Sequence, residues 1–203
     1  MEAVDSRQAI KDMALGLLVR HGYRGMSFAE IAAALGTTRA NIHYHFGTKA
    51  ALIEEVLADY VAATLANLRT IWAEGEARFP ARVETMLAYS RQRFDAFNGG
   101  AGPVQPWSLI SRLRQDDGLL SPAGHDQLSG FTAALEQVFG AALARAALRG
   151  ELRDGEMAHD LALILAAVAD NAAPITLAGN GFSRLEAVYR GIVRLAAAAG
   201  AGS

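Results

Sequence analysis

The chain has 203 residues, 52% of them hydrophobic, no cysteine and a formal net charge of −2 at pH 7. This length argues against two large unrelated domains, and the lack of cysteine excludes disulfides and thiolate metal sites. Residues 1–49 hold six Lys or Arg and four Asp or Glu, whereas residues 50–203 hold 13 and 17. The distribution fits a small basic module that meets an anion and is carried by an acidic body.

Alanine and leucine dominate the composition and aromatic residues are few, which predicts an all-α fold. The longest wholly apolar run, "LALILAAVA" at 161–169, is about half the roughly 20 residues that span a bilayer. The first residues include acids rather than the basic start of a signal peptide. We therefore expect a cytoplasmic protein without a membrane partner.

The first three predicted helices are short or of moderate length. Apolar spacing predicts a first helix, with Asp5 as its N-cap and Gly22 as its end. Ser27 and Glu30 have the spacing of a capping box, which starts a second helix that ends before Gly36. A third helix follows at once, capped by Thr38 and running to about residue 44.

Longer helices follow from residue 48 onward. Capping residues, prolines and apolar spacing predict them at about 48–74, 80–97, 107–118, 122–148, 157–177 and 183–198. The total is about nine helices.

Two short helices joined by about three residues that include glycine, after a longer supporting helix, form a helix-turn-helix pattern. The major groove of B-DNA is about 12 Å wide and admits one α-helix. The predicted third helix reads "TRANIHYH" and is followed by Phe46. Ile42 and Phe46 would anchor the inner side of this helix. Arg39, Asn41, His43 and Tyr44 would face outward, where such groups can read base edges or hold phosphates.

Lys49 occupies the first position of the next helix, where the macrodipole is positive and acids are preferred. A phosphate bound at that helix end would account for it. Ser27 and Thr38 are caps that can also contact phosphate. For His45, DNA contact and half-burial against the supporting helices are equally good interpretations.

The stretch "GYRGMSFAEIAAALGTTRANIHYHFGTKAALIEEVL" resembles the TetR-type transcriptional regulators over about residues 6–58. "RGELRDGEMAHDLALILAAVADN" is similar, more weakly, to a later region of that family. Thr37 replaces the usual aliphatic turn residue, and His43 stands where tyrosine is common. The proposed DNA-contacting set is Ser27, Thr37, Thr38, Arg39, Asn41, His43, Tyr44, His45 and Lys49.

The resemblance implies a three-helix DNA-binding head at residues 1–49 and a helical effector-binding and dimerisation body at residues 50–203. It also implies a homodimer that binds a palindromic operator in double-stranded DNA, most simply as a repressor. A small-molecule effector, which the apolar body suggests is itself apolar, would release it. No cofactor is expected.

Side chains of the body carry less information. Asn171 falls on an apolar face, where it could bond a ligand, a partner subunit or the carbonyls freed by Pro174. Phe94, Trp107 and Phe131 are candidates for a ligand pocket, with core packing as the alternative. The predicted dimer interface, with packing inside one subunit as its alternative, consists of Leu185, Val188, Tyr189, Ile192 and Leu195.

Two other classes of function are alternatives to DNA binding. The sequence has no G-x-S-x-G, no Walker motif, no H-E-x-x-H and no cysteine nucleophile, so we predict no enzyme and no catalytic residue. His43 and His45 point about 200° apart on a helix and cannot chelate one metal ion. A helical interaction protein of the same fold without DNA binding is the alternative, against which the exposed cations of the head argue.

Overall fold

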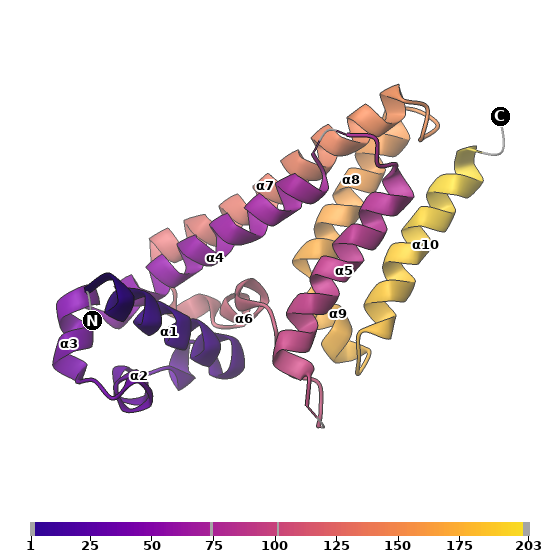
Figure 1. The fold of residues 1–203 in the computed structure, drawn as a ribbon. Coiled ribbons are helices and arrows are strands. Elements are labelled where there is room, and N and C mark those ends of the chain that lie inside the picture. Colours follow the sequence, from indigo (N-terminus) through magenta and orange to yellow (C-terminus); the bar gives the residue numbers. More distant parts are fainter. Residues whose placement is uncertain (1–2, 74, 101, 201–203) are drawn as a thin grey trace. The chain divides into compact units, whose positions relative to one another are not determined.

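The computed structural model describes residues 3–73, 75–100 and 102–200, and these form ten α-helices, one 3₁₀ turn and no strand (Figure 1). The all-α prediction is confirmed, with one helix more than the expected nine. The helices are α1 Ala3–Gly25, α2 Phe28–Leu35, α3 Arg39–Phe46, α4 Lys49–Ile71, α5 Phe79–Asn98, α6 Leu109–Gln115, α7 Pro122–Leu148, α8 Gly155–Asp170, α9 Ala172–Ala178 and α10 Ser183–Gly200, with the 3₁₀ turn η1 at Asp117–Leu119.

The chain packs as two compact units. The first comprises Met1–Ala63 and Ser108–Ser129, and the second Thr64–Trp107 and Gly130–Ser203, so α4 and α7 each contribute to both. The predicted division after residue 49 follows the sequence motif, whereas these units follow packing. The division of function between head and body therefore stays a prediction.

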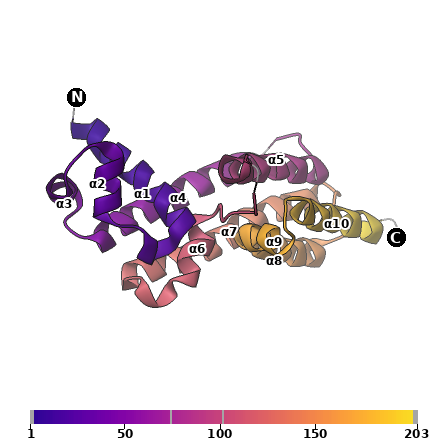
Figure 2. The same cartoon turned by 90° about the horizontal axis from the view of Figure 1, so that it is seen from below.

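In the first unit α1 packs against α2 and α6, and α2 packs against α3 (Figures 1 and 2). Its core is aliphatic, with Ile10, Leu18 and Ile31 fully buried. Two ion pairs join α1 to α4, Arg7 to Glu55 at 2.6 Å and Lys11 to Asp59 at 2.5 Å. Because both pairs keep solvent access, each contributes at most about 1 kcal/mol. These two cations are thereby occupied within the unit.

The second unit has an aromatic centre. The ring of Trp72 meets that of Phe139 edge-on, with centroids 5.2 Å apart, and lies 6.3 Å from Phe79. Such geometry adds about 0.5–1.5 kcal/mol per pair to the apolar burial. Buried Arg82 donates to the carbonyl oxygens of Ile71 at 2.8 Å and Ala77 at 2.9 Å, which satisfies carbonyls at and beyond the end of α4. Further along the chain, α10 packs against α5 and α9.

Two element boundaries differ from the predictions. The first helix begins at Ala3, so Asp5 lies inside it rather than at its N-cap, and the Asp5 side chain lies outside the described residues. The single helix predicted at 157–177 is instead α8 and α9, bent by 64°. The physical reason is Pro174, which has no N–H for the carbonyl of Asp170 and would clash with it.

Gly22 interrupts α1, as predicted, with φ 71° and ψ −171°, but helical structure resumes as far as Gly25.

Across the described ranges, no single helix has the length and apolar character that a membrane span requires. The bent pair of α8 and α9 meets the length and composition test only when the two are taken together.

Candidate nucleic-acid interface

The turn between α2 and α3 is set by caps and one glycine. Ser27 caps α2, because its hydroxyl oxygen accepts the N–H of Glu30 at 3.2 Å and its O–H donates to the Glu30 carboxylate at 2.8 Å. Gly36 ends the helix in the left-handed conformation, with φ 62° and ψ 32°. The N–H of Thr37 then donates to the carbonyl of Ala32 at 3.0 Å. The chain thus leaves α2 and enters α3 within three residues.

The inner side of α3 is fixed as the sequence predicted. Thr38 is the N-cap, and its hydroxyl oxygen accepts the N–H of Asn41 at 3.1 Å. Ile42 and Phe46 are buried, and the guanidinium of Arg7 lies 4.6 Å from the Phe46 ring centre. A cap of this kind contributes about 1 kcal/mol, so α3 is held at its start and along its inner face.

Arg39 and Tyr44 form the open part of the outer face. Tyr44 is 85% exposed, with its ring edge 5.4 Å from that of His45. Arg39 is exposed and has no hydrogen bond or ion pair with any residue that the structure describes. An exposed guanidinium at the first position of a short helix and an exposed phenol at its sixth are suited to phosphate oxygens and base edges.

Asn41 and His43 are held by neighbours. The side-chain amide of Asn41 donates to the hydroxyl of Thr37 at 3.0 Å. The Nδ1 atom of His43 lies 2.8 Å from the carbonyl oxygen of Gly47, and its ring meets Phe28 edge-on at 4.8 Å. Because a carbonyl can only accept, Nδ1 carries the proton, and in the neutral ring Nε2 is an acceptor. The ring is thereby fixed in both orientation and tautomer.

His45 is half-buried, and its ring centre lies 6.2 Å from that of Phe46. Partial burial is the alternative that the sequence left open, and contact with DNA remains a prediction for this residue.

Lys49 is the first residue of α4, as predicted, and its ammonium lies 4.7 Å from the centre of the Tyr23 ring. Burial lowers the pKa of Lys49, while the charges of Glu30 and Asp116 act in the opposite direction. Tyr23 is the functional candidate that the sequence analysis missed. Its only signal was an aromatic residue directly after the glycine that breaks the first helix.

The candidate pocket residues of the body are mostly core. Phe94, Trp107 and Phe131 are buried, and the indole N–H of Trp107 donates to the hydroxyl of Thr176 at 2.8 Å. Phe94 also lines a pocket of about 210 Å³ beneath the loop after α5. A role for these side chains in ligand binding stays a prediction.

The premise for Asn171 was wrong. Its side chain is exposed rather than buried, and its amide donates to the carbonyl of Ala167 at 2.9 Å, one turn earlier. The break before Pro174 turns this position away from the apolar face on which a continuous helix would place it.

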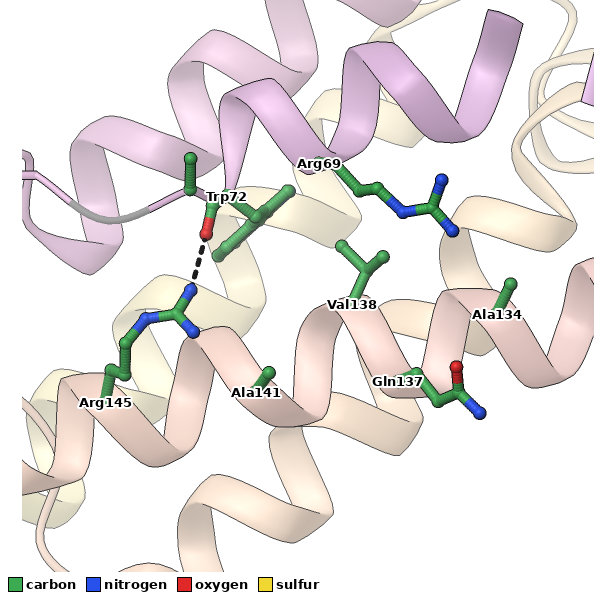
Figure 3. A pocket seen from close by; sticks show the side chains of 8 residues that line it. Arg69, Trp72, Ala134, Gln137, Val138, Ala141 and Arg145 are labelled. Atoms are coloured by element: carbon green, nitrogen blue, oxygen red, sulfur yellow. Dashed lines mark hydrogen bonds between the residues drawn. The ribbon is translucent and has the colours of Figure 1, made fainter. Parts of the chain in front are cut away.

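A second hollow of about 270 Å³ lies between α4 and α7, as Figure 3 shows. Its polar walls are Arg69, Gln137 and Arg145, and one guanidinium N–H of Arg145 donates to the carbonyl of Trp72 at 2.8 Å. That bond satisfies the carbonyl of the residue directly after α4, so Arg145 already has a structural role. None of the predicted ligand-binding residues lines this hollow.

The five residues of the predicted dimer interface differ in exposure. Leu185, Tyr189 and Ile192 are buried within their own chain, which is the alternative that the sequence left open, and a role for them in an interface stays a prediction. Val188 is half-buried, and Leu195 is 69% exposed.

Two apolar residues of α8 that the sequence analysis did not select, Leu163 and Ile164, are 42% and 45% exposed. Exposed apolar side chains of this size on two helices of one unit are typical of a protein–protein interface. Together with Leu195 they are the better candidates.

Comparison with known proteins adds independent findings. Residues 10–56 match the family model described as "Bacterial regulatory proteins, tetR family". A stretch of 79 residues is 37% identical to the HTH-type transcriptional regulator AcrR of Shigella flexneri, and spans 39% of this chain and 35% of that protein.

The whole chain also resembles solved structures. A TetR-family regulator from Agrobacterium tumefaciens matches with a TM-score of 0.82 and 19% identity, over 96% of this chain and 99% of that one. A transcriptional regulator from Saccharomonospora viridis, solved in complex with choline, matches with a TM-score of 0.72 and 22% identity, over 95% of both chains.

The capped α2, the glycine turn and the anchored α3 form a helix-turn-helix, and the remaining helices complete a fold of the kind found in these solved regulators. Residues 10–56 thus match the TetR family model, and the chain as a whole has the fold of solved TetR-family regulators.

Proposed function

We propose that this protein is a TetR-type transcriptional regulator that binds a palindromic operator as a homodimer, most simply as a repressor, and is released by a small-molecule effector. One observation carries the proposal. A short helix, capped by Thr38 and anchored inside by Ile42, carries the exposed Arg39 and Tyr44 and ends three residues before the lysine that begins α4. An α-helix with such an outer face fits the major groove and is flanked by groups that hold phosphates.

The side chains of the head would have two roles, contact with the DNA backbone and recognition of bases. Arg39, Tyr44 and Lys49, together with the capped helix ends at Ser27 and Thr38, would hold the duplex backbone and set the register. His43 would read bases, because its fixed Nε2 acceptor suits the exocyclic amino group of adenine or cytosine. A hydrogen bond from the Asn41 amide to a base would compete with its hydrogen bond to the Thr37 hydroxyl.

Two heads are needed for a palindromic site, with half-sites about 34 Å apart. The exposed side chains of Leu163, Ile164 and Leu195 support a partner surface on α8 and α10. In a two-fold dimer the same patch serves both subunits.

A small-molecule effector is supported by the fold of the body. The Saccharomonospora viridis regulator of similar fold was solved with choline. The aromatic side chains of the second unit, among them Phe94 and Trp107, suit an apolar ligand or apolar groups of one.

Titration with a duplex of arbitrary sequence at increasing salt tests DNA binding. We expect binding at low ionic strength. The logarithm of the affinity should fall linearly with the logarithm of the salt concentration, with a slope of about −0.9 for each phosphate contacted. Failure to bind any duplex at low salt would favour the alternative, a helical interaction protein of the same fold.

Substitutions should separate backbone contact from base reading. Lys49→Ala should weaken binding to all sequences alike and reduce the salt slope by about 1, whereas His43→Ala or Asn41→Ala should change which bases are preferred. Affinities measured over a set of single-base variants of a selected site would show the difference.

Arg69→Ala serves as the charge control for Lys49→Ala. Arg69 is an exposed cation 20 residues further along α4, about 30 Å along the helix axis. Equal, sequence-independent losses from Lys49→Ala, His43→Ala and Asn41→Ala would contradict the assigned roles.

A further inference from the structure

We propose that Tyr23 is a positioning residue for Lys49: its ring holds the ammonium at the start of α4, and Asp116 holds Tyr23 in place. The inference rests on the proposed phosphate contact of Lys49. It assigns roles to two residues outside the helix-turn-helix motif, one after the break in α1 and one at the end of α6.

The break in α1 makes room for this arrangement. Gly22 has φ 71° and ψ −171°, and the N–H of Tyr23, the next residue, donates to the Asp116 carboxylate at 2.7 Å. A Cβ atom on residue 22 would stand 2.4 Å from that carboxylate oxygen and 2.8 Å from Nε of Arg112. The carboxylate therefore occupies space that only glycine leaves open. Asp116 is the C-cap residue of α6, so the bond joins the ends of two helices.

The support under Lys49 is a ring rather than an ion pair. Its ammonium lies 4.7 Å from the Tyr23 ring centre. Glu30 and Asp116 act on it through their charge, yet neither forms an ion pair with it among the described residues. A lysine held by a carboxylate must break that pair to bind phosphate. A lysine held by a ring keeps its N–H donors, and its long side chain is already restricted.

Restriction before binding has a measurable consequence. A free lysine side chain loses rotamer entropy when it is immobilised at an interface. If the ring removes part of that loss in advance, replacing the ring by an aliphatic side chain should weaken binding to every duplex alike. The expected factor is about 2 to 5, which is the size of an exposed cation–π contact.

The test uses the full chain and a duplex of arbitrary sequence at low salt. Tyr23→Leu should lose about 2- to 5-fold in affinity, and Tyr23→Phe, which keeps the ring, should stay near the wild type. In the Lys49→Ala background, Tyr23→Leu should have no further effect. A loss of equal size in that background would show that Tyr23 acts through the fold, and would overturn the proposal.

A measurement without DNA separates this inference from the proposed function. The methylene protons next to the Lys49 nitrogen should show an upfield ring-current shift in NMR spectra, and Tyr23→Leu should abolish it while the thermal unfolding curve changes little. Absence of that shift in the wild type would overturn the positioning role, even if DNA binds. If the shift is present but the protein binds no duplex, the proposed function is wrong and the contact between Tyr23 and Lys49 stands.

Discussion

Gly22→Ala should destabilise the protein by about 1–3 kcal/mol, because this backbone conformation is nearly restricted to glycine and the new methyl group would displace the Asp116 carboxylate. The φ of 71° with ψ −171° is strained for any L side chain, and the added Cβ would stand 2.4 Å from the Asp116 carboxylate. Urea unfolding followed by circular dichroism measures the loss. The Tyr23 bond to Asp116 would also be displaced, so DNA affinity should fall together with stability.

Gly16→Ala is the matched control in the same helix. Nothing lies within 4 Å of a Cβ built there, and alanine is the better helix former. This variant should be more stable than the wild type by about 0.5–1 kcal/mol. Equal tolerance of alanine at both glycines would contradict the account of the break in α1.

The double variant Ile164→Asp with Leu195→Asp should be monomeric at micromolar concentration and should lose at least about 10-fold in affinity for a palindromic site. Both side chains are exposed in the single chain, so their replacement should not disturb its core. In a two-fold interface each new carboxylate occurs once in each subunit. Each would be buried without a cation to pair with, at a cost of a few kcal/mol. Sedimentation analysis reports the oligomeric state.

Leu148→Asp controls for the general effect of a new carboxylate at an exposed leucine. Leu148 is 88% exposed at the end of α7, outside α8 and α10, and its replacement should leave the assembly unchanged. An unaltered dimer in the double variant would exclude the proposed patch, and a monomeric wild type would exclude a dimer altogether.

Features of the fold that depend on neighbours in sequence were predictable. Ser27 and Thr38 as caps, Gly36 as the turn and Ile42 as the inner anchor all follow from local spacing, and the structure confirms them. Lys49 at the start of α4 was predicted in the same way. Local chemistry also determines most of the proposed interface, because the interface is one continuous stretch of chain.

Contacts between distant segments were not predictable. Tyr23 and Asp116 are 93 residues apart, and nothing in their sequence surroundings indicates the bond between them. For α10 the sequence left two interpretations open, because an apolar stripe on a helix does not show which surface covers it. Leu185, Tyr189 and Ile192 form the stripe that packs inside the chain, and Val188 and Leu195 lie about 70° to one side of it, at 100° per residue.

The break between α8 and α9 illustrates a different limit. Pro174 was visible in the sequence, and its missing N–H was recognised. Apolar spacing on both sides nevertheless favoured a continuous helix, so Asn171 was placed on a buried face that does not exist.

Selection of bound duplexes from a random-sequence library tests the central claim most directly. The account predicts an enriched inverted repeat whose half-sites are centred one helical turn, or a multiple of it, apart, and an insertion of about 5 base pairs between them should abolish tight binding because it turns one half-site to the opposite face. Recovery of no enriched sequence, or of a site without two-fold symmetry that tolerates the insertion, would contradict it.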